Sequence, residues 1–179
     1  MALACALVPL GIGVIAIDFH LRHAEAMPPS PPGYLGAHLY TTWNVLEPDR
    51  LAAMWVLQRF VDPQARFHFV APFSHIMHGT PFDTPEATIR RQGTRSVTEE
   101  LLAQSKLEHD KRLVLLGRMT HLYEITSWMR PTDPSAYQLG KTLLTTTGKC
   151  KPHELFQCVK RAFRYLDGWY ERVSPASTS

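Results

Sequence analysis

His121 and Glu124 are the two residues of this sequence whose types and spacing most directly indicate chemistry. They stand three positions apart in a segment with helical periodicity, so both side chains are expected on one helix face. An imidazole and a carboxylate placed in this way can bind a divalent cation or share a proton. The alternative, which we favour from sequence, is a partly buried histidine hydrogen-bonded to its neighbour. The pair is therefore a candidate metal or acid–base site.

Two further groupings contain metal-ligand residue types. His75 and His78 also stand three apart, but they lie between prolines in an expected loop, and two ligands fall short of the usual three or four. Cys150, His153 and Glu154 gather at an expected helix start. Surface histidines at the first place and helix capping at the second are the favoured interpretations.

Four charged residues flank an apolar segment that is expected to form a buried helix: Asp49, Arg50, Arg59 and Asp62. Charged groups beside an apolar helix usually form ion pairs or extend to water. An arginine held by packing can instead bind an oxyanion through its planar guanidinium. Structural ion pairs and an oxyanion site therefore both stay open.

The composition excludes several function classes. The 179 residues are 45% hydrophobic and 20% charged, as in ordinary globular proteins. The net charge of +3 is spread along the chain, and the densest basic run, Arg90-Arg91 with Arg95, is short, so no nucleic-acid partner is expected. The chain lacks a phosphate-binding glycine loop, a Gly-x-Ser-x-Gly elbow, a Cys-x-x-Cys pair and a His-Glu-x-x-His motif.

The segment Asp49–Val70 predicts a helix, a turn ended by proline, and a strand. Apolar residues recur at helical spacing from Leu51 to Phe60, and Pro63 stops the helix because the residue before proline leaves the α region. Phe67 and Phe69 then alternate with polar neighbours, which is strand periodicity. These elements belong to the core of the predicted domain.

The remaining elements follow the same periodicities. Strands are expected at Tyr34–Trp43 and Ala87–Gln92, and an edge or turn at Pro81–Pro85. A capping box at Ser96 and Glu99 opens one helix. Three more helices are expected over Asp110–Trp128, from Pro134 to about Gly148, and from Pro152 to Val173. The predicted fold class is α+β and predominantly helical: one domain with a small sheet of short strands packed by about five helices.

The two ends of the chain are expected to lie outside that domain. Residues 1–26 are apolar and end in a small-x-small pattern, which predicts a signal peptide or membrane-anchoring leader. No lysine or arginine precedes the apolar run, so an N-terminal arm or a misplaced start codon is the alternative. A proline-rich linker is expected at 27–33, the domain at 34–173 and a disordered tail at 174–179. The leader predicts a periplasmic or inner-membrane-anchored protein, with the cytoplasm as the alternative.

Cys150 and Cys158 are expected to be free thiols. An even pair in an exported protein favours a disulfide. However, Pro152 is expected to begin a helix that carries Cys158 almost two turns along, which strains the Cα separation of about 7 Å that a bridge allows.

The block Asp49–Val70 resembles the chromate-resistance protein family, specifically the C-terminal domain of ChrB-type proteins. The matching residues are Asp49-Arg50-Leu51-Ala52, Trp55, Arg59–Pro63, Ala65, Phe67, Phe69 and Val70. Pro81–Asp83, Gly93, Glu99, Leu101, Leu102 and His121 follow in the family's order, so the resemblance spans about Thr41–Glu124. Full-length members carry an N-terminal domain implicated in gene regulation, and that role is not expected of this chain.

The resemblance implies an accessory role in chromate resistance, with export, in which the domain binds an oxyanion or a metal ion. The implied site is built from Arg59, Asp83, Glu99, His121 and Glu124. The expected partner is a small anion or metal ion, and the cofactor, if there is one, a divalent metal. The alternatives are a divergent enzyme that uses His121 and Glu124 with Asp83, and an interaction module without a site.

Three positions depart from the family pattern as it is expected here. Ala53 stands in place of a cysteine, Arg91 and Gln92 stand where a histidine is expected, and Glu124 replaces an aspartate. The first two changes remove a thiol and an imidazole that could bind or reduce an oxyanion. Asp49–Val70 is therefore better evidence for ancestry than for activity.

Overall fold

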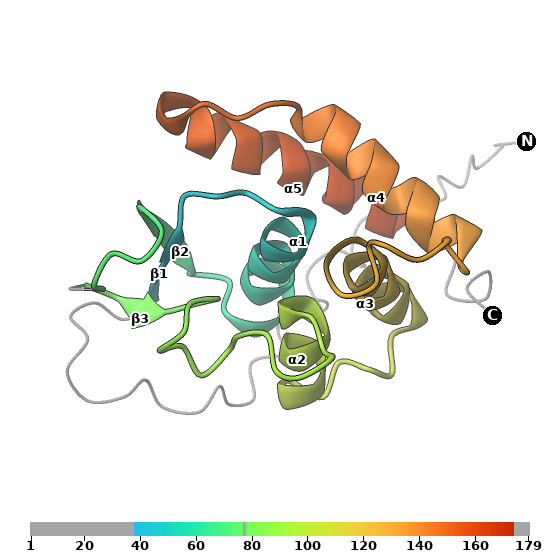
Figure 1. Cartoon of the computed structure of the whole chain (residues 1–179), viewed down its shortest axis with the longest axis horizontal. Coiled ribbons are helices and arrows are strands. Elements are labelled where there is room, and N and C mark those ends of the chain that lie inside the picture. The colour runs from blue at the N-terminus through green and yellow to red at the C-terminus, as the bar shows by residue number, and fades with distance from the viewer. Residues whose placement is uncertain (1–37, 77, 174–179) are drawn as a thin grey trace, which may run out of the picture.

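The computed structural model describes residues 38–76 and 78–173, which form a small parallel sheet beside a layer of helices (Figure 1). The sheet contains β1 (Leu39–Trp43), β2 (Arg66–Val70) and β3 (Thr80–Pro81) in the order β2-β1-β3. Both pairings with the central strand β1 are parallel. The predicted α+β, predominantly helical fold class is confirmed. The predicted leader, linker and tail, and residues 34–37 of the first predicted strand, lie outside the described residues.

Helix α1 (Pro48–Val56) is the centre of the fold. Proline at its first turn has the fixed φ that a helix start requires, and all nine of its residues are buried. The helix continues as a π-helical turn, η1 (Leu57–Val61), and ends at Asp62, before Pro63 as predicted. The path from β1 through α1 to β2 is thus a parallel strand–helix–strand crossover.

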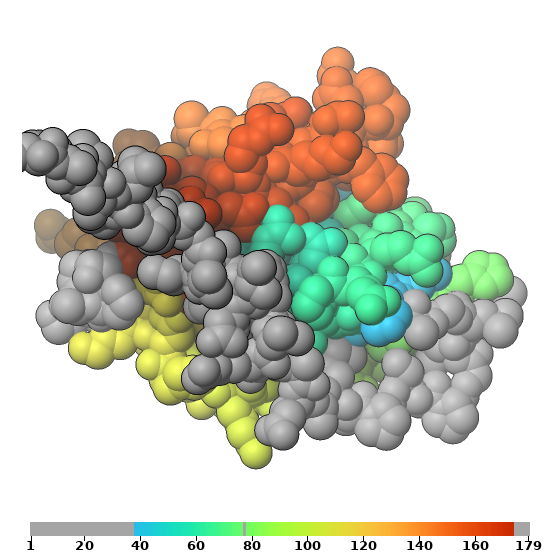
Figure 2. Space-filling view, turned by 180° about the vertical axis from the view of Figure 1, so that it is seen from behind, coloured from blue at the N-terminus to red at the C-terminus, as the bar shows by residue number. Residues whose placement is uncertain are grey.

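Four more helices cover α1. They are α2 (Val97–Gln104), α3 (Lys111–Glu124), α4 (Pro134–Thr147) and α5 (Leu155–Arg172), with a single 3-10 turn, η2 (Pro152–Glu154), before α5. The capping box at Ser96 and Glu99 is confirmed. Figure 2, the view from behind, shows α5 lying against the segment that contains β2. No helix in the described residues is long and apolar enough to cross a membrane.

Two predicted elements are wrong or too long. Residues 87–92 are not a strand, because the loop folds on itself: Asp83 N donates to Ile89 O at 2.9 Å, and Arg90 Nη1 donates to Ala87 O at 3.0 Å. Only a bridge between Gln92 and Arg95 has strand-like pairing there. The predicted helix over Asp110–Trp128 ends at Glu124.

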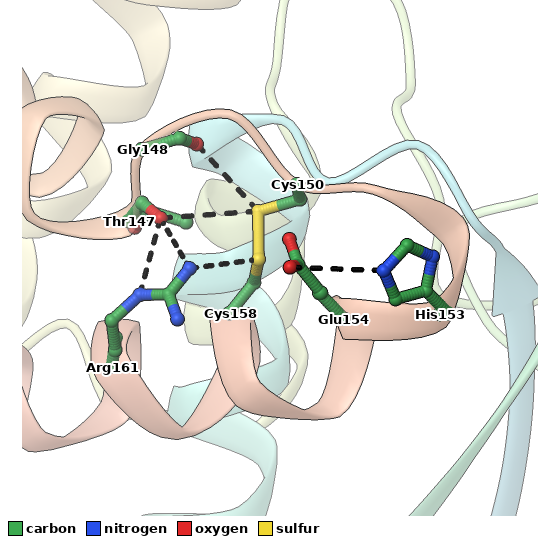
Figure 3. The surroundings of a disulfide bond; sticks show 7 residues. All are labelled: Thr147, Gly148, Cys150, His153, Glu154, Cys158 and Arg161. Atoms are coloured by element: carbon green, nitrogen blue, oxygen red, sulfur yellow. Dashed lines mark hydrogen bonds and ion pairs between the residues drawn. A yellow bond between two sulfur atoms is a disulfide. The ribbon is translucent and has the colours of Figure 1, made fainter.

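The prediction of two free thiols is also wrong, because Cys150 and Cys158 form a disulfide (Figure 3). The chain turns at Gly148, whose φ is +67°, and η2 is only one 3-10 turn, so Cys158 lies in the first turn of α5. The two Cα atoms are consequently 6.1 Å apart, within the range that a bridge allows. Arg161 Nη2 lies 3.2 Å from the Cys158 sulfur and donates to Thr147 O at 2.8 Å.

Candidate functional site

A polar cavity of about 290 Å³, here called the strand-end pocket, lies where β1 and β3 end and α1 begins. The carboxyl ends of parallel strands, beside the point where the sheet order reverses, are the usual place for ligands in open α/β sheets. The pocket is lined by residues from five segments: Trp43, Glu47, Asp49, Arg50, Asp83, Thr84, Pro85, Arg90, Arg91 and Glu124.

Arg50 is the most deeply buried cation of the pocket, with a side chain 4% exposed. Its Nη2 lies 2.7 Å from Asp83 Oδ2, and its Nη1 donates to the carbonyl of Val45. The guanidinium lies 5.9 Å from the centre of the Trp43 ring, within range of a cation–π contact. Its buried Nε has no hydrogen-bond partner among the described residues. Arg50 thus has both a fixed position and one unused donor.

Two carboxyl groups of the pocket hold their protons unusually well. Burial raises the pKa of Asp83 to about 6, although the neighbouring Arg50 guanidinium opposes the shift. Burial also raises the pKa of Glu124 to about 7, assisted by the negative charges of Glu47 and Asp49 and opposed by Arg91. Both groups can therefore exchange protons near neutral pH, which is typical of functional sites.

Two more arginines come from the loop that precedes α2. Arg91 is exposed and its Nη2 lies 3.3 Å from Glu124 Oε2, while Arg90 is fixed by the carbonyls of its own loop. Together with Arg50, they place three guanidinium groups around one cavity. Such groups match the geometry of oxyanions.

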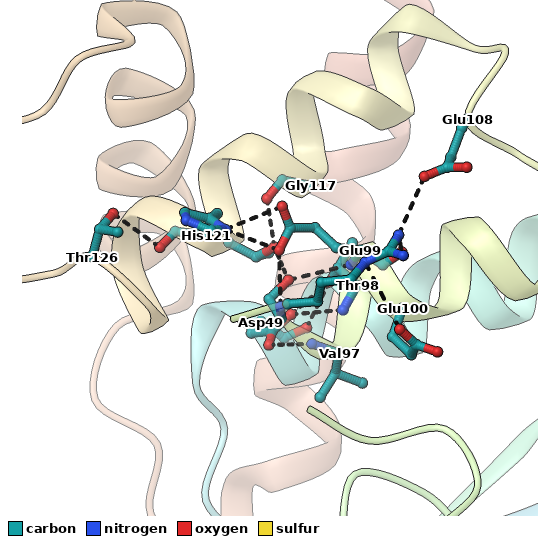
Figure 4. Close-up of polar contacts among 12 residues, drawn as sticks. Asp49, Val97, Thr98, Glu99, Glu100, Glu108, Gly117, His121 and Thr126 are labelled. Atoms are coloured by element: carbon teal, nitrogen blue, oxygen red, sulfur yellow. Dashed lines mark hydrogen bonds and ion pairs between the residues drawn. The ribbon is translucent and has the colours of Figure 1, made fainter. Parts of the chain in front are cut away.

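Asp49 lines the same pocket, yet its carboxylate is occupied by the start of α2 (Figure 4). Its oxygens accept from Val97 N at 2.8 Å, Thr98 N at 2.9 Å and Thr98 Oγ1 at 2.7 Å. A carboxylate is favourable at the positive end of a helix. Asp49 therefore connects α1 to α2 and supports the pocket structurally.

His121 and Glu124 share α3 but have different partners. His121 Nδ1 lies 3.1 Å from Glu99 Oε2, and the same carboxylate accepts from Ser96 N at 2.8 Å in the capping box (Figure 4). Glu124 lies in the strand-end pocket beside Arg91. In the described residues, no three His, Cys, Asp or Glu side chains are grouped so that they could hold a metal ion.

The other two predicted site residues lie away from the pocket. Arg59 forms a two-pronged ion pair with Asp167 of α5, at 2.8 Å and 2.9 Å, which lowers the pKa of Asp167 against the effect of burial. Asp62 accepts from Tyr40 at 3.0 Å and lies 2.8 Å from His38 Nδ1. The structure thus brings together only Asp49, Arg50, Asp83 and Glu124 from the predicted set.

The main pocket residues that sequence reasoning missed are Trp43, Glu47, Arg90 and Arg91. A signal for Glu47 existed, because it stands between an expected strand end and an expected helix start, where parallel sheets place their ligands. Arg90 and Arg91 had no such signal. The sequence assigned them to the end of a strand that does not form.

Comparison with known proteins gives the chain's family. Residues 40–173 match the family described as "ChrB, C-terminal domain". The chain is similar to Protein ChrB of Cupriavidus metallidurans, with 32% identity over 117 residues, which covers 62% of this chain and 36% of that protein. The chain therefore spans well under half of its relative's length. No solved structure matched. Since the family match covers most of the described residues, the chain belongs to the ChrB-type chromate-resistance family, through its C-terminal domain.

Proposed function

We propose that this domain serves chromate resistance by binding a tetrahedral oxyanion of the chromate class in the strand-end pocket. The observation that carries the proposal is Arg50, a buried guanidinium with an unused Nε donor, beside Arg90 and Arg91. Charge-assisted hydrogen bonds from arginine to an oxyanion are among the strongest in proteins. Membership of the chromate-resistance family supports the choice of anion.

The raised pKa values of Asp83 and Glu124 fit this role. An ionised carboxylate beside the anion would repel it, whereas a protonated one donates a hydrogen bond to an anion oxygen. With pKa values of about 6 and about 7, both groups can take up a proton as the anion arrives. Anion affinity is therefore expected to fall as the pH rises above about 7.

Isothermal titration of the protein with chromate, sulfate, phosphate and zinc tests the proposal. Chromate is expected to release heat, and Arg91→Gln to weaken its binding about tenfold, the loss of one charge-assisted bond. Arg118→Gln is the matched control, because Arg118 is an exposed arginine of α3 that does not line the pocket. Absence of anion binding, or an equal loss in both variants, would overturn the proposal. Zinc binding that is abolished by Glu124→Gln would replace the anion with a metal.

We also propose that the domain acts outside the cytoplasm. The Cys150–Cys158 disulfide supports this location, because such bonds persist in oxidising compartments. Cell fractionation followed by alkylation and mass spectrometry tests it. The protein is expected in the periplasmic or membrane fraction with both cysteines protected from alkylation until reduction. A cytoplasmic protein with two alkylated cysteines would contradict the proposal.

A further inference from the structure

The largest hollow of the described structure, about 1000 Å³, lies between β2 and α5 and is called the β2–α5 groove. Its apolar lining comes from both elements: Phe67 and Phe69 of β2, and Phe156, Val159 and Phe163 of α5. The space-filling view shows α5 directly beside this segment (Figure 2). The groove shares no residue with the strand-end pocket.

Strand β2 is an edge strand in the described sheet, because the order is β2-β1-β3. Arg66 N donates to His38 O at 2.7 Å and Val70 O accepts from Asn44 N at 2.8 Å, so these residues point their backbone toward β1. In a parallel ladder, alternate residues point to opposite sides. Phe67 and Phe69 consequently direct their N–H and C=O groups toward the open edge, where another strand can pair.

The groove follows this open edge. Four consecutive residues of β2, from Arg66 to Phe69, line it. Successive side chains of a strand point to opposite faces of the sheet, so a cavity lined by all four must pass around the strand's edge. The cavity is therefore shaped to admit a chain beside β2.

Aromatic contacts fix the opposite wall. The ring centres of Phe69 and Phe156 are 5.5 Å apart, and those of Phe67 and Phe163 are 6.4 Å apart. Phe156 nevertheless has 62% of its surface exposed. An exposed aromatic side chain in a groove is a typical anchor for the apolar side chains of a partner.

The charged residues of the groove are almost all cationic. Arg66, Lys160 and Arg164 line it, are exposed, and form no ion pair with a carboxylate of the described residues. The one acidic residue of the lining, Asp167, is neutralised by Arg59 at 2.8 Å. The groove thus presents three uncompensated positive charges to any ligand.

We propose that the β2–α5 groove binds an extended acidic peptide segment of a partner protein, which adds a strand to the open edge of β2. Backbone groups of Phe67 and Phe69 pair with the peptide, as in other strand-addition sites. The peptide's apolar side chains alternate toward the phenylalanines, and its acidic side chains face Arg66, Lys160 and Arg164. A second copy of this chain fits poorly, because two cationic rims would repel each other.

Fluorescence polarisation with a labelled peptide of about eight residues that alternates glutamate and valine tests this inference. The peptide is expected to bind in low salt and to weaken as salt is added. The double variant Lys160→Glu/Arg164→Glu is expected to weaken binding by more than about tenfold. Lys141→Glu is the matched control, since Lys141 is an exposed lysine of α4 outside the groove. Circular dichroism confirms that each variant is folded.

A second probe tests the backbone pairing. The same peptide with N-methyl groups at alternate positions keeps its charges and apolar side chains but loses half of its backbone donors. Its binding is expected to be lost when the methyl groups face β2. Equal binding of both methylated registers would overturn strand addition, and so would an unlabelled amphipathic carboxylate such as decanoate displacing the peptide from a groove that binds it more tightly. Dimerisation in sedimentation that Phe156→Asp abolishes would assign the groove to a second copy. Arg91→Gln is expected to leave peptide binding unchanged, so this test is independent of the proposed anion site.

Discussion

The strand-end pocket and the β2–α5 groove both contain three cationic side chains, but they hold their charges differently. In the pocket, Arg50 is buried and paired with Asp83, and Glu124 is beside Arg91. In the groove, Arg66 and its cationic neighbours on α5 are exposed and unpaired with carboxylates in the described residues. Buried charges are needed for the fold because each supports another, whereas exposed charges are available to a partner. Substitutions should therefore cost stability in the pocket and affinity in the groove.

The largest effect is expected from Arg50→Met. It removes the cation while leaving the buried Asp83 carboxyl without its 2.7 Å partner. Breaking a buried ion pair from one side typically costs about 4 kcal/mol of unfolding free energy. Urea denaturation followed by circular dichroism measures the loss. A cost below about 1 kcal/mol, the value of an exposed pair, would show that the pocket is not held together by this contact.

Asp49→Ala is expected to cost about 3 kcal/mol, because it leaves the buried N–H groups of Val97 and Thr98 without their acceptor. Asp133→Ala is the matched control: Asp133 also caps a helix, but it accepts only from Ala136 N and is partly exposed. A cost of about 1 kcal/mol is expected there. Equal costs in the two variants would contradict the view that Asp49 connects two helices in addition to capping one.

Removal of the disulfide by Cys150→Ser/Cys158→Ala tests whether the groove can change independently of the pocket. Closing a loop between residues eight apart stabilises the fold by about 2.5 kcal/mol through chain entropy. Since Cys158 begins the helix that carries Phe156, peptide binding in the groove is expected to weaken, and chromate binding to stay unchanged. Titration of both ligands on the same variant measures the difference. Loss of both activities together would join the two regions into one cooperative unit.

The sequence predicts elements best where one local signal determines them. Pro48 and Pro63 bracket the first helix, and Ser96 with Glu99 begins the second, as the structure confirms. These signals act within a few residues, so no tertiary knowledge is needed. The spacing of apolar residues on α5 predicted its buried face for the same reason.

The site is less predictable, because it depends on contacts between distant segments. Arg50 and Asp83 are brought together by the sheet order, which neither residue's neighbours encode. His121 pairs with Glu99 across two helices, although its spacing from Glu124 indicates a different partner. The disulfide was missed because the 3-10 turn at Pro152 shifts the start of α5. Each error therefore reflects a geometry that is set outside the local sequence.

The pH dependence of stability sharpens the comparison on the pocket side. Burial raises the pKa of Glu124 from 4.5 to about 7, so the folded protein keeps a proton that the unfolded chain releases. Stability should consequently be highest below about pH 4.5 for this group and fall as the pH rises toward 7. Glu124→Gln removes this loss and should stabilise the protein at pH 8 by about 1 kcal/mol, after allowance for solvent screening. Glu108→Gln, at an exposed acid paired with Arg95, is the control and should have no such effect. Destabilisation by Glu124→Gln at pH 8 would show that its pairing with Arg91 outweighs the effect of burial.

The smallest effect on stability is expected from Arg164→Gln in the groove. Arg164 is exposed and contacts no carboxylate of the described residues, so its loss should change the unfolding free energy by less than about 0.5 kcal/mol. The affinity for the acidic peptide should nonetheless fall several-fold, because one of three positive charges is removed. Parallel urea and polarisation measurements on this variant and on Arg50→Met compare the two regions directly. If Arg164→Gln lost as much stability as Arg50→Met, the exposed charges would belong to the fold and the groove would lose its distinction from the pocket.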